Sequence, residues 1–231
     1  MDKICVVTGG TRGLGFEIVK KLVKDGHKVC VISKSTNDNF EDLLNGNKKK
    51  ILFFKANIVD EDSINKIANE VVSKYDIEVL INNAGVIRVG DFRNIKYNDV
   101  KAVMDANIVG TMLVTKAFLP KIKEQNAGKI VIINSSAGLL GKPMESIYCA
   151  AKFAQHGYIL ALKEELKKTR IKVLGCYPGG MNTSFYDSIR DYAPKEVTNK
   201  FMRPDQVAKV ICENIYAAES LNISEIIIER I

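Results

Sequence analysis

The chain of 231 residues is 46% apolar and 26% charged, which is the composition of a folded globular protein and excludes a disordered one. Its 34 basic and 27 acidic residues give a net charge of +7, but the surplus is scattered, so no nucleic-acid partner is expected. Five dispersed cysteines and two histidines without partners at ligand spacing predict reduced thiols, a cytoplasmic location and no bound metal.

Short apolar runs rich in isoleucine and valine alternate with longer amphipathic stretches along the chain. None of the runs reaches the ~18 residues that a membrane span requires, so no membrane association is expected. Runs that are apolar at every position are typical of strands buried on both faces of a parallel sheet. The predicted strands are residues 4–8, 28–33, 51–56, 79–82, 129–135, 171–177 and 225–229.

Apolar residues at helical spacing lie between these strands, starting with two short helices around Phe16 and Ile64. Longer helices are predicted at about 98–125, 146–168 and 204–219. Pro120 is expected to kink or end the first of these. The alternation of strand and helix predicts an α/β fold, a single Rossmann-type domain over residues 1–231. Its doubly wound parallel sheet would have about seven strands with helices on both faces.

The segment 182–203 is long and has no clear periodicity. Such a segment is either a functional lid or a poorly ordered loop, and its aromatic residues favour a substrate lid over about 183–203. With Leu139 and Met144, the aromatic residues of this lid are predicted to form the apolar walls of a substrate pocket. They are Phe185, Tyr186, Tyr192 and Phe201.

A glycine-rich loop, Thr-Gly-Gly-Thr-Arg-Gly-Leu-Gly at residues 8–15, connects the first predicted strand to the first helix. Gly9, Gly13 and Gly15 allow a tight turn and a close approach of the backbone to a pyrophosphate. The start of the helix then offers free N–H groups and a positive dipole end to the phosphates. A glycine cluster can be an ordinary turn, but this position in an α/β chain favours dinucleotide binding.

Further motifs follow in a consistent order. They are Asn-Asn-Ala-Gly at 82–85, Asn107 in the next helix, Asn-Ser-Ser-Ala-Gly at 134–138, Tyr148-x-x-x-Lys152, and Tyr-Pro-Gly-Gly-Met-Asn-Thr at 177–183. Together with the Gly-x-x-x-Gly-x-Gly loop, these motifs resemble those of the classical short-chain dehydrogenase/reductase family. The resemblance covers essentially the whole chain.

The resemblance implies a catalytic tetrad of Asn107, Ser135, Tyr148 and Lys152. Tyr148 and Lys152 are four residues apart on a helix and share one face, where an ammonium favours the phenolate of a tyrosine that ordinarily titrates near pKa ~10. Ser135 would hydrogen-bond the substrate oxygen, Lys152 would also bind the nicotinamide ribose, and Asn107 would hold a water that links Lys152 to solvent. Ser136 competes for the role of Ser135, but Ser135 is at the family spacing before the tyrosine, and strand neighbours point to opposite sides.

The resemblance also implies the residues that contact the cofactor, most of which follow the ends of successive strands. They are Gly9, Thr11, Arg12, Gly13, Leu14, Gly15, Ser33, Lys34, Asn57, Ile58, Asn83, Ala84, Gly85, Tyr148, Lys152, Pro178, Gly179, Met181 and Thr183.

The end of the second strand predicts NADPH/NADP+ as the cofactor. NAD-preferring folds place a carboxylate there to bind the ribose hydroxyls, whereas this strand ends in Ser33 and Lys34, with no acid before Asp38. Ser33 can donate a hydrogen bond to a 2′-phosphate, Lys34 supplies a positive charge, and Arg12 in the glycine loop is the family's other usual contact.

The predicted function is an NADP(H)-dependent oxidoreductase that interconverts a small-molecule carbonyl and a secondary alcohol by hydride transfer, with Tyr148 as general acid/base. A catalytically silent NADP(H)-sensing or scaffolding protein is the alternative, but such proteins usually lose the tyrosine or the lysine. Family members commonly pair the helices corresponding to 98–125 and 146–168 with those of a second subunit. Both helices carry apolar residues on more than one face, among them Met112 and Phe153, so a homodimer or homotetramer is expected.

Overall fold

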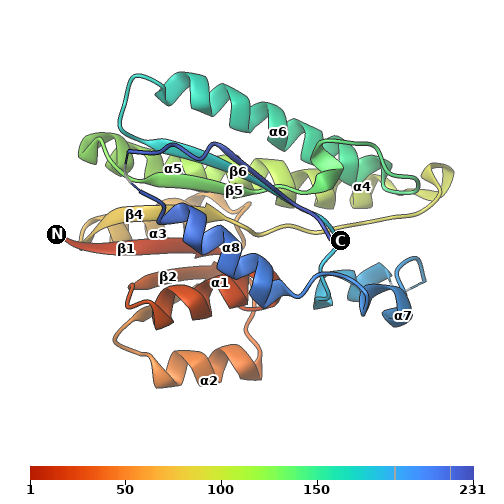
Figure 1. Ribbon diagram of the computed structural model, residues 1–231, viewed down its shortest axis with the longest axis horizontal. Helices are drawn as coiled ribbons and strands as arrows, with labels where there is room; N and C mark the ends of the chain where they lie inside the picture. The colour runs from red at the N-terminus through yellow and green to blue at the C-terminus, as the bar shows by residue number, and fades with distance from the viewer. Residues whose placement is uncertain (190, 219) are drawn as a thin grey trace.

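Seven parallel strands form one sheet in the computed structural model, which describes residues 1–189, 191–218 and 220–231 (Figure 1). The strand order is β3-β2-β1-β4-β5-β6-β7. The chain builds outward from β1 through β2 to β3 and then returns to place β4 on the other side of β1. This reversal beside β1 is the switch point of a doubly wound sheet, so the predicted fold class is confirmed.

The strands agree with the predicted ones, with one larger difference at the start of the fourth. They are β1 (Asp2–Thr8), β2 (Val29–Ser33), β3 (Ile51–Lys55), β4 (Tyr75–Asn82), β5 (Lys129–Ile133), β6 (Lys172–Pro178) and β7 (Glu225–Ile228). The prediction began β4 at residue 79. The sequence hides its first half because Asp76 and Glu78 interrupt the apolar pattern.

Helices cover both faces of the sheet (Figure 1). They are α1 (Gly13–Lys24), α2 (Asp38–Gly46), α3 (Glu61–Val72), α4 (Tyr97–Met104), α5 (Gly110–Gln125), α6 (Ser146–Leu166), α7 (Lys195–Thr198) and α8 (Pro204–Ile215). Helices α1 and α8 pack together on one face, where α2 adds Phe40, and α3, α5 and α6 cover the other. The prediction ended the last helix at Glu219, which lies outside the described residues, whereas α8 ends at Ile215.

Alternate residues of each central strand face opposite helical layers. In β1, Ile4 and Val6 pack on the side of α3, α5 and α6, whereas Cys5 and Val7 pack on the side of α1 and α8. All four side chains are fully buried. A strand covered on both sides needs apolar residues at every position, which explains the uninterrupted runs in the sequence.

The single helix predicted at 98–125 is divided into α4, a π-helical turn at Asp105–Val109, and α5. Pro120 does not end α5, which continues to Gln125. The combined helix Tyr97–Gln125 is long and apolar enough to cross a membrane by length and composition. However, Val114, Phe118 and Ile122 are fully buried in the core beside the sheet, and a core helix meets the same criteria.

The predicted lid segment folds back over the carboxyl ends of the strands. Its base is closed by a bridge between Met181 and Met202, and the Tyr192 hydroxyl donates to Pro143 O at 2.9 Å. Between these points the chain forms a 3-10 turn at Ser184–Ile189 and the short helix α7. Arg190 of the predicted lid lies outside the described residues.

Candidate active site

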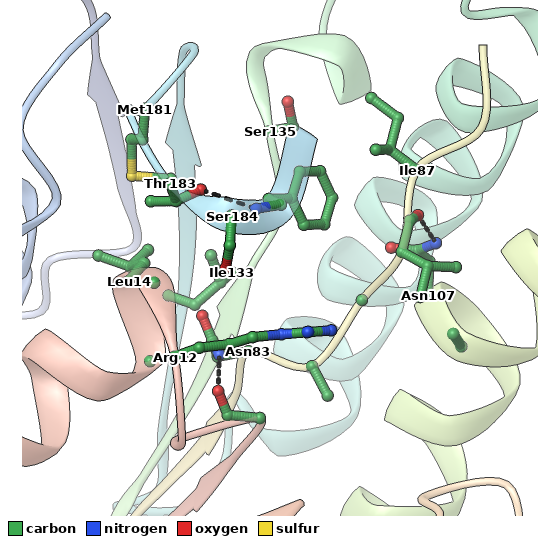
Figure 2. A pocket seen from close by; sticks show the side chains of 18 of the residues that line it. Arg12, Leu14, Asn83, Ile87, Asn107, Ile133, Ser135, Met181, Thr183 and Ser184 are labelled. Atoms are coloured by element: carbon green, nitrogen blue, oxygen red, sulfur yellow. Dashed lines mark hydrogen bonds between the residues drawn. The ribbon is translucent and has the colours of Figure 1, made fainter. Parts of the chain in front are cut away.

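All the predicted catalytic and cofactor-contacting residues line one cleft at the carboxyl ends of the strands (Figure 2). Arg12 of the glycine loop and the neighbouring Asn83 lie in the lower part of the view, and Ser135 and Thr183 lie in the upper part. Asn107 comes from the facing wall. The switch point between β1 and β4 therefore brings together motifs that are far apart in the sequence.

Gly9 and Gly15 make the glycine loop tight. Gly9 has a φ of +64°, which a residue with a side chain rarely adopts. A Cβ at Gly15 would lie 2.3 Å from Gly9 O, so no side chain fits where α1 starts. The side chain of Asn83 donates to Thr8 O at 3.0 Å and to Gly9 O at 3.1 Å, which fixes the loop against the end of β4.

The N-terminus of α1 fits an anionic group. Arg12 precedes the helix without capping it through its side chain, and the first turn contains no acidic residue. The free N–H groups and the positive dipole end therefore face the cleft without a protein counter-charge, which suits a pyrophosphate. Within the described part of the chain, neither Arg12 nor Lys34 forms an ion pair, and Ser33 Oγ lies 3.0 Å from Thr11 Oγ1.

Asn107 lies in the π-helical turn, a departure from regular helix that is frequent at functional sites. Its side-chain amide donates to Val86 O and to Val103 O, both at 2.8 Å. Its buried Oδ1 has no hydrogen-bond partner among the described residues. Gly85 lies close against this atom, since a Cβ there would be 2.6 Å from it. An unpaired buried acceptor of this kind fits a bound water or a ligand group.

Lys152 is almost completely buried and is held by two acceptors. Its Nζ donates to Ile133 O at 3.0 Å and to Gln155 Oε1 at 2.9 Å. Gln155 Nε2 in turn donates to Asn107 O at 2.7 Å, so Gln155 connects the lysine to the π-helical turn. Burial lowers the pKa of Lys152 to about 7, because desolvation disfavours the charged ammonium.

The sequence analysis missed Gln155, although a signal was present. Gln155 follows Lys152 by three residues in α6 and therefore shares its helix face. A buried amide at that position has to find partners, and the lysine and the backbone of Asn107 supply them.

Tyr148 lies in the same cleft as Ser135, and the Lys152 ammonium is 5.8 Å from the centre of its ring. Burial raises the pKa of Tyr148, the nearby Tyr186 adds to this, and a hydrogen bond with Ser135 opposes it. Lys152 is not among the groups that lower the pKa of Tyr148, although the sequence predicted that effect. Burial, which also lowers the pKa of the lysine itself, therefore favours the neutral phenol.

Ser135 and Ser136 have different surroundings. Ser135 lines the cleft, whereas Ser136 is buried beside it and accepts a hydrogen bond from Lys142 Nζ at 3.0 Å. Cys149, the neighbour of Tyr148, is buried and does not line the cleft.

The wall beyond Tyr148 agrees in part with the predicted one, since the predicted Phe185 and Tyr186 line the cleft. Ile87, Phe185 and Tyr186 line it, and the Phe185 ring is 6.1 Å from that of Tyr148. The predicted Leu139 and Met144 are outside the cleft, because Leu139 packs on the core and Met144 turns outward with a φ of +63°. Of the other predicted aromatic walls, Phe201 packs edge-on against Tyr186 and Tyr192 is half-exposed, and neither lines the cleft.

Two charged residues of this wall, Lys142 and Glu145, were not predicted. Glu145 comes three residues before Tyr148, a spacing that places it on the same side of α6, and this was the available signal. Burial raises the pKa of the Glu145 carboxyl, and the charge of Lys142 opposes that shift. The substrate end of the cleft therefore combines an apolar surface with two groups of opposite charge.

The model of the short chain dehydrogenase family matches residues 3–193. The chain belongs to this family. It is 30% identical over 217 residues to the 3-oxoacyl-[acyl-carrier-protein] reductase FabG of Thermotoga maritima, covering 90% of this chain and 88% of the relative. It is also 30% identical to a 3-ketodihydrosphingosine reductase of Bacteroides thetaiotaomicron, over 80% of this chain and 66% of the relative. The family makes the chain an oxidoreductase.

Solved structures share the fold over almost the whole length. The closed form of a serine dehydrogenase complexed with NADP+ superposes with a TM-score of 0.88 at 22% identity, covering 98% of this chain and 94% of the other. ElxO with NADP bound gives a TM-score of 0.88 at 25% identity and covers 99% and 98% of the two chains.

The contacts of Gln155 predict a loss of stability when its amide is removed. Gln155→Leu removes one of the two acceptors of the Lys152 ammonium and one of the two side-chain donors to Asn107 O, so the free energy of unfolding should fall by about 1–3 kcal/mol. Urea unfolding followed by circular dichroism measures it. The matched control is Gln206→Leu on the exposed side of α8, which should change stability by less than about 0.5 kcal/mol. Equal effects of the two substitutions would contradict this account of Lys152.

Proposed function

We propose that the protein is an NADP(H)-dependent oxidoreductase that interconverts a small-molecule carbonyl and a secondary alcohol. The observation that carries this proposal is the position of Tyr148, Ser135, Lys152 and Asn107 in the same cleft as the glycine loop and the start of α1. A catalytically silent sensor remains the weaker alternative, because nothing in the cleft replaces the tyrosine or the lysine.

The glycine loop and the N-terminus of α1 would hold the pyrophosphate, and the ends of β4 and β6 would flank the nicotinamide half of the cofactor. The remaining expected contacts at this edge are Asn57, Ile58, Ala84, Pro178, Gly179, Met181 and Thr183. When bound, the nicotinamide supplies or accepts the hydride.

The side chains of the cleft would move the proton. In reduction, the phenol of Tyr148 donates its proton to the substrate oxygen. Ser135 donates a hydrogen bond to the same oxygen and stabilises the developing charge. Lys152 lies beside the tyrosine with part of its ammonium free to bind a ribose hydroxyl, and Asn107 Oδ1 would accept from a water that returns protons from solvent.

The preference for NADP(H) is proposed from the polar groups at the end of β2. Lys34 and Ser33 line the cleft together with Arg12. Among the described residues that line the cleft, the only acidic one is Glu145, which belongs to the wall beyond Tyr148. Figure 2 shows the Arg12 side chain extended across the cleft beside Asn83. The NADP bound to ElxO supports the same assignment.

We further propose that the protein is a cytoplasmic homodimer or homotetramer with no nucleic-acid or membrane partner and no catalytic metal. The assembly proposal rests on apolar side chains that α6 and the segment around the start of α5 expose. They are Val109, Met112, Phe153 and Leu160.

Tyr148→Phe should lower kcat by about 10²–10⁴-fold, because the proton donor is lost while the ring is kept. NADPH oxidation with a panel of ketones and aldehydes measures the rate, and fluorescence titration should show unchanged NADPH affinity. Tyr97→Phe, which removes the hydroxyl of an exposed tyrosine, is the control and should keep full activity. Retention of more than about a tenth of the activity in Tyr148→Phe would rule out this acid.

The wild-type enzyme should have a kcat/KM for NADPH that is roughly a hundredfold higher than for NADH, from about 3 kcal/mol in two charge-assisted contacts. Arg12→Ala and Lys34→Ala should each reduce that ratio, and the double substitution should nearly abolish it. Lys24→Ala removes a charge at the far end of α1 and should leave the ratio unchanged. A double variant with the wild-type ratio would overturn the assignment.

Light scattering at micromolar concentration should give the mass of a dimer or tetramer. Phe153→Glu should lower that mass, because it places a charge on the exposed apolar side of α6, whereas Phe92→Glu on a separate exposed turn should not. A monomeric wild-type protein would contradict the proposed assembly.

A further inference from the structure

Four side chains with metal-ligand or proton-donor chemistry meet away from the active-site cleft. Cys5 of β1, His27 after α1 and Glu78 of β4 have one ligand atom each, and these three atoms lie within 4.8 Å of one another. The hydroxyl of Tyr216, which follows α8, lies 3.2 Å from Cys5 Sγ. The cluster is on the α1 and α8 side of the sheet, near the end of α1, whereas the start of α1 faces the cofactor cleft.

A β-bulge places Glu78 in this cluster. The pairing of β1 with β4 shifts between Ile4 and Cys5, which oppose Ile77 and Val79, so Glu78 is the extra residue. As a result Ile77 packs in one core layer and Val79 in the other, although they are two residues apart. A bulge interrupts the hydrogen-bond ladder and changes the direction in which a side chain points, and bulges are frequent next to functional sites. Here it brings a carboxylate oxygen to 3.6 Å from a buried thiol.

The end of α1 places His27 beside the carboxylate. Gly26 has a φ of +98°, and His27 N returns to Leu22 O at 3.0 Å, a hydrogen bond that closes the helix. His27 Nδ1 then lies 3.1 Å from Glu78 Oε2, and its ring stacks on Tyr216 with 4.5 Å between the centres. The bulge in β4, the end of α1 and the segment after α8 therefore bring Glu78, His27 and Tyr216 together beside Cys5.

We propose that Cys5 Sγ, His27 Nδ1 and Glu78 Oε2 form a binding site for Zn²⁺. With Zn–S near 2.3 Å and Zn–N and Zn–O near 2.0–2.2 Å, neighbouring corners of a tetrahedron are roughly 3.3–3.6 Å apart. The thiol–carboxylate distance of 3.6 Å and the imidazole–carboxylate distance of 3.1 Å are close to those edges. One sulfur, one nitrogen and one oxygen make a mixed donor set that suits zinc rather than calcium or magnesium.

The surroundings are consistent with metal entry and retention. The side chains of His27 and Glu78 are 23% and 24% exposed, which leaves a path for an ion, whereas Cys5 is fully buried. Water would complete the tetrahedron. The hydroxyl of Tyr216 lies 3.3 Å from His27 Nδ1 as well as beside the sulfur, so it can hydrogen-bond the thiolate or that water. The ion would join β1, β4 and the end of α1 and act as a structural staple.

The sequence predicted no metal, because the three ligands are far apart along the chain and neither histidine has a partner at ligand spacing. The proposal is independent of the proposed catalytic function, since none of the four residues lines the cofactor cleft.

Zinc binding tests the site directly. The purified full chain is incubated with Zn²⁺, passed through gel filtration and analysed for metal, and Co²⁺ titration reports thiolate coordination through its charge-transfer absorption. We expect one zinc ion per chain, a thiolate–cobalt band and a higher melting temperature with zinc. Cys5→Ser, His27→Gln and Glu78→Gln should each raise Kd by about a hundredfold or more, and Tyr216→Phe by about tenfold.

Matched controls use residues of the same kinds elsewhere in the chain. His156→Gln and Cys30→Ala should retain the wild-type affinity, since His156 contacts Tyr177 and Cys30 faces the other core layer. If Cys5→Ser does not fold, the partly exposed Glu78→Gln decides the question. A wild-type chain that retains no zinc, or zinc binding that the ligand substitutions leave unchanged, would overturn the proposal.

Discussion

The close approach of the glycine loop to the end of β4 is the constraint on which the cleft depends. A Cβ at Gly15 would be 2.4 Å from Asn83 Nδ2 as well as 2.3 Å from Gly9 O, so α1, the loop and the end of β4 meet without space for a side chain. Thr8 Oγ1 accepts from Asn83 N and Ala84 N, at 3.0 and 3.1 Å, and fastens the same contact. Since β1 and β4 are the strands beside which the chain reverses, this contact joins the two halves of the sheet. It thereby helps to set the distance between the start of α1 and the side chains that we propose to be catalytic.

A second constraint is the burial of the Lys152 ammonium. Removing a cation from water is costly unless hydrogen bonds replace its hydration. The protein supplies two acceptors, Ile133 O and Gln155 Oε1, and the pKa of the lysine still falls to about 7. The same low-polarity surroundings raise the pKa of Tyr148 and keep its proton in place. Gln155 therefore couples the position of the lysine to the backbone of Asn107, so that two residues of the proposed tetrad share one amide-centred network.

Two departures from regular secondary structure coincide with the two polar clusters. The π-helical turn at Asp105–Val109 directs Asn107 into the cleft, and the bulge at Glu78 directs a carboxylate toward Cys5 and His27. Each departure disturbs a backbone hydrogen-bond pattern and therefore costs stability. Irregular secondary structure of this kind is frequent at functional sites. The candidate active-site cleft and the proposed zinc site follow this rule at different places on the same central strands.

The sequence by itself determined the fold class, because strands buried on both faces must be apolar throughout, as 4–7 and 130–133 are. It also indicated the lining of the cleft, since motifs that end parallel strands meet at one edge of the sheet. Only the tertiary structure decided which partners the buried polar groups have. The partners of Lys152 on α6 include Ile133 O, a backbone atom of β5, and the neighbours of Cys5 come from β4 and from the segments that follow α1 and α8. Such contacts depend on helix ends, a bulge and strand register, which are set by packing over the whole chain. Periodicity and motif spacing describe local structure, so they do not predict these contacts between residues that are far apart in the sequence.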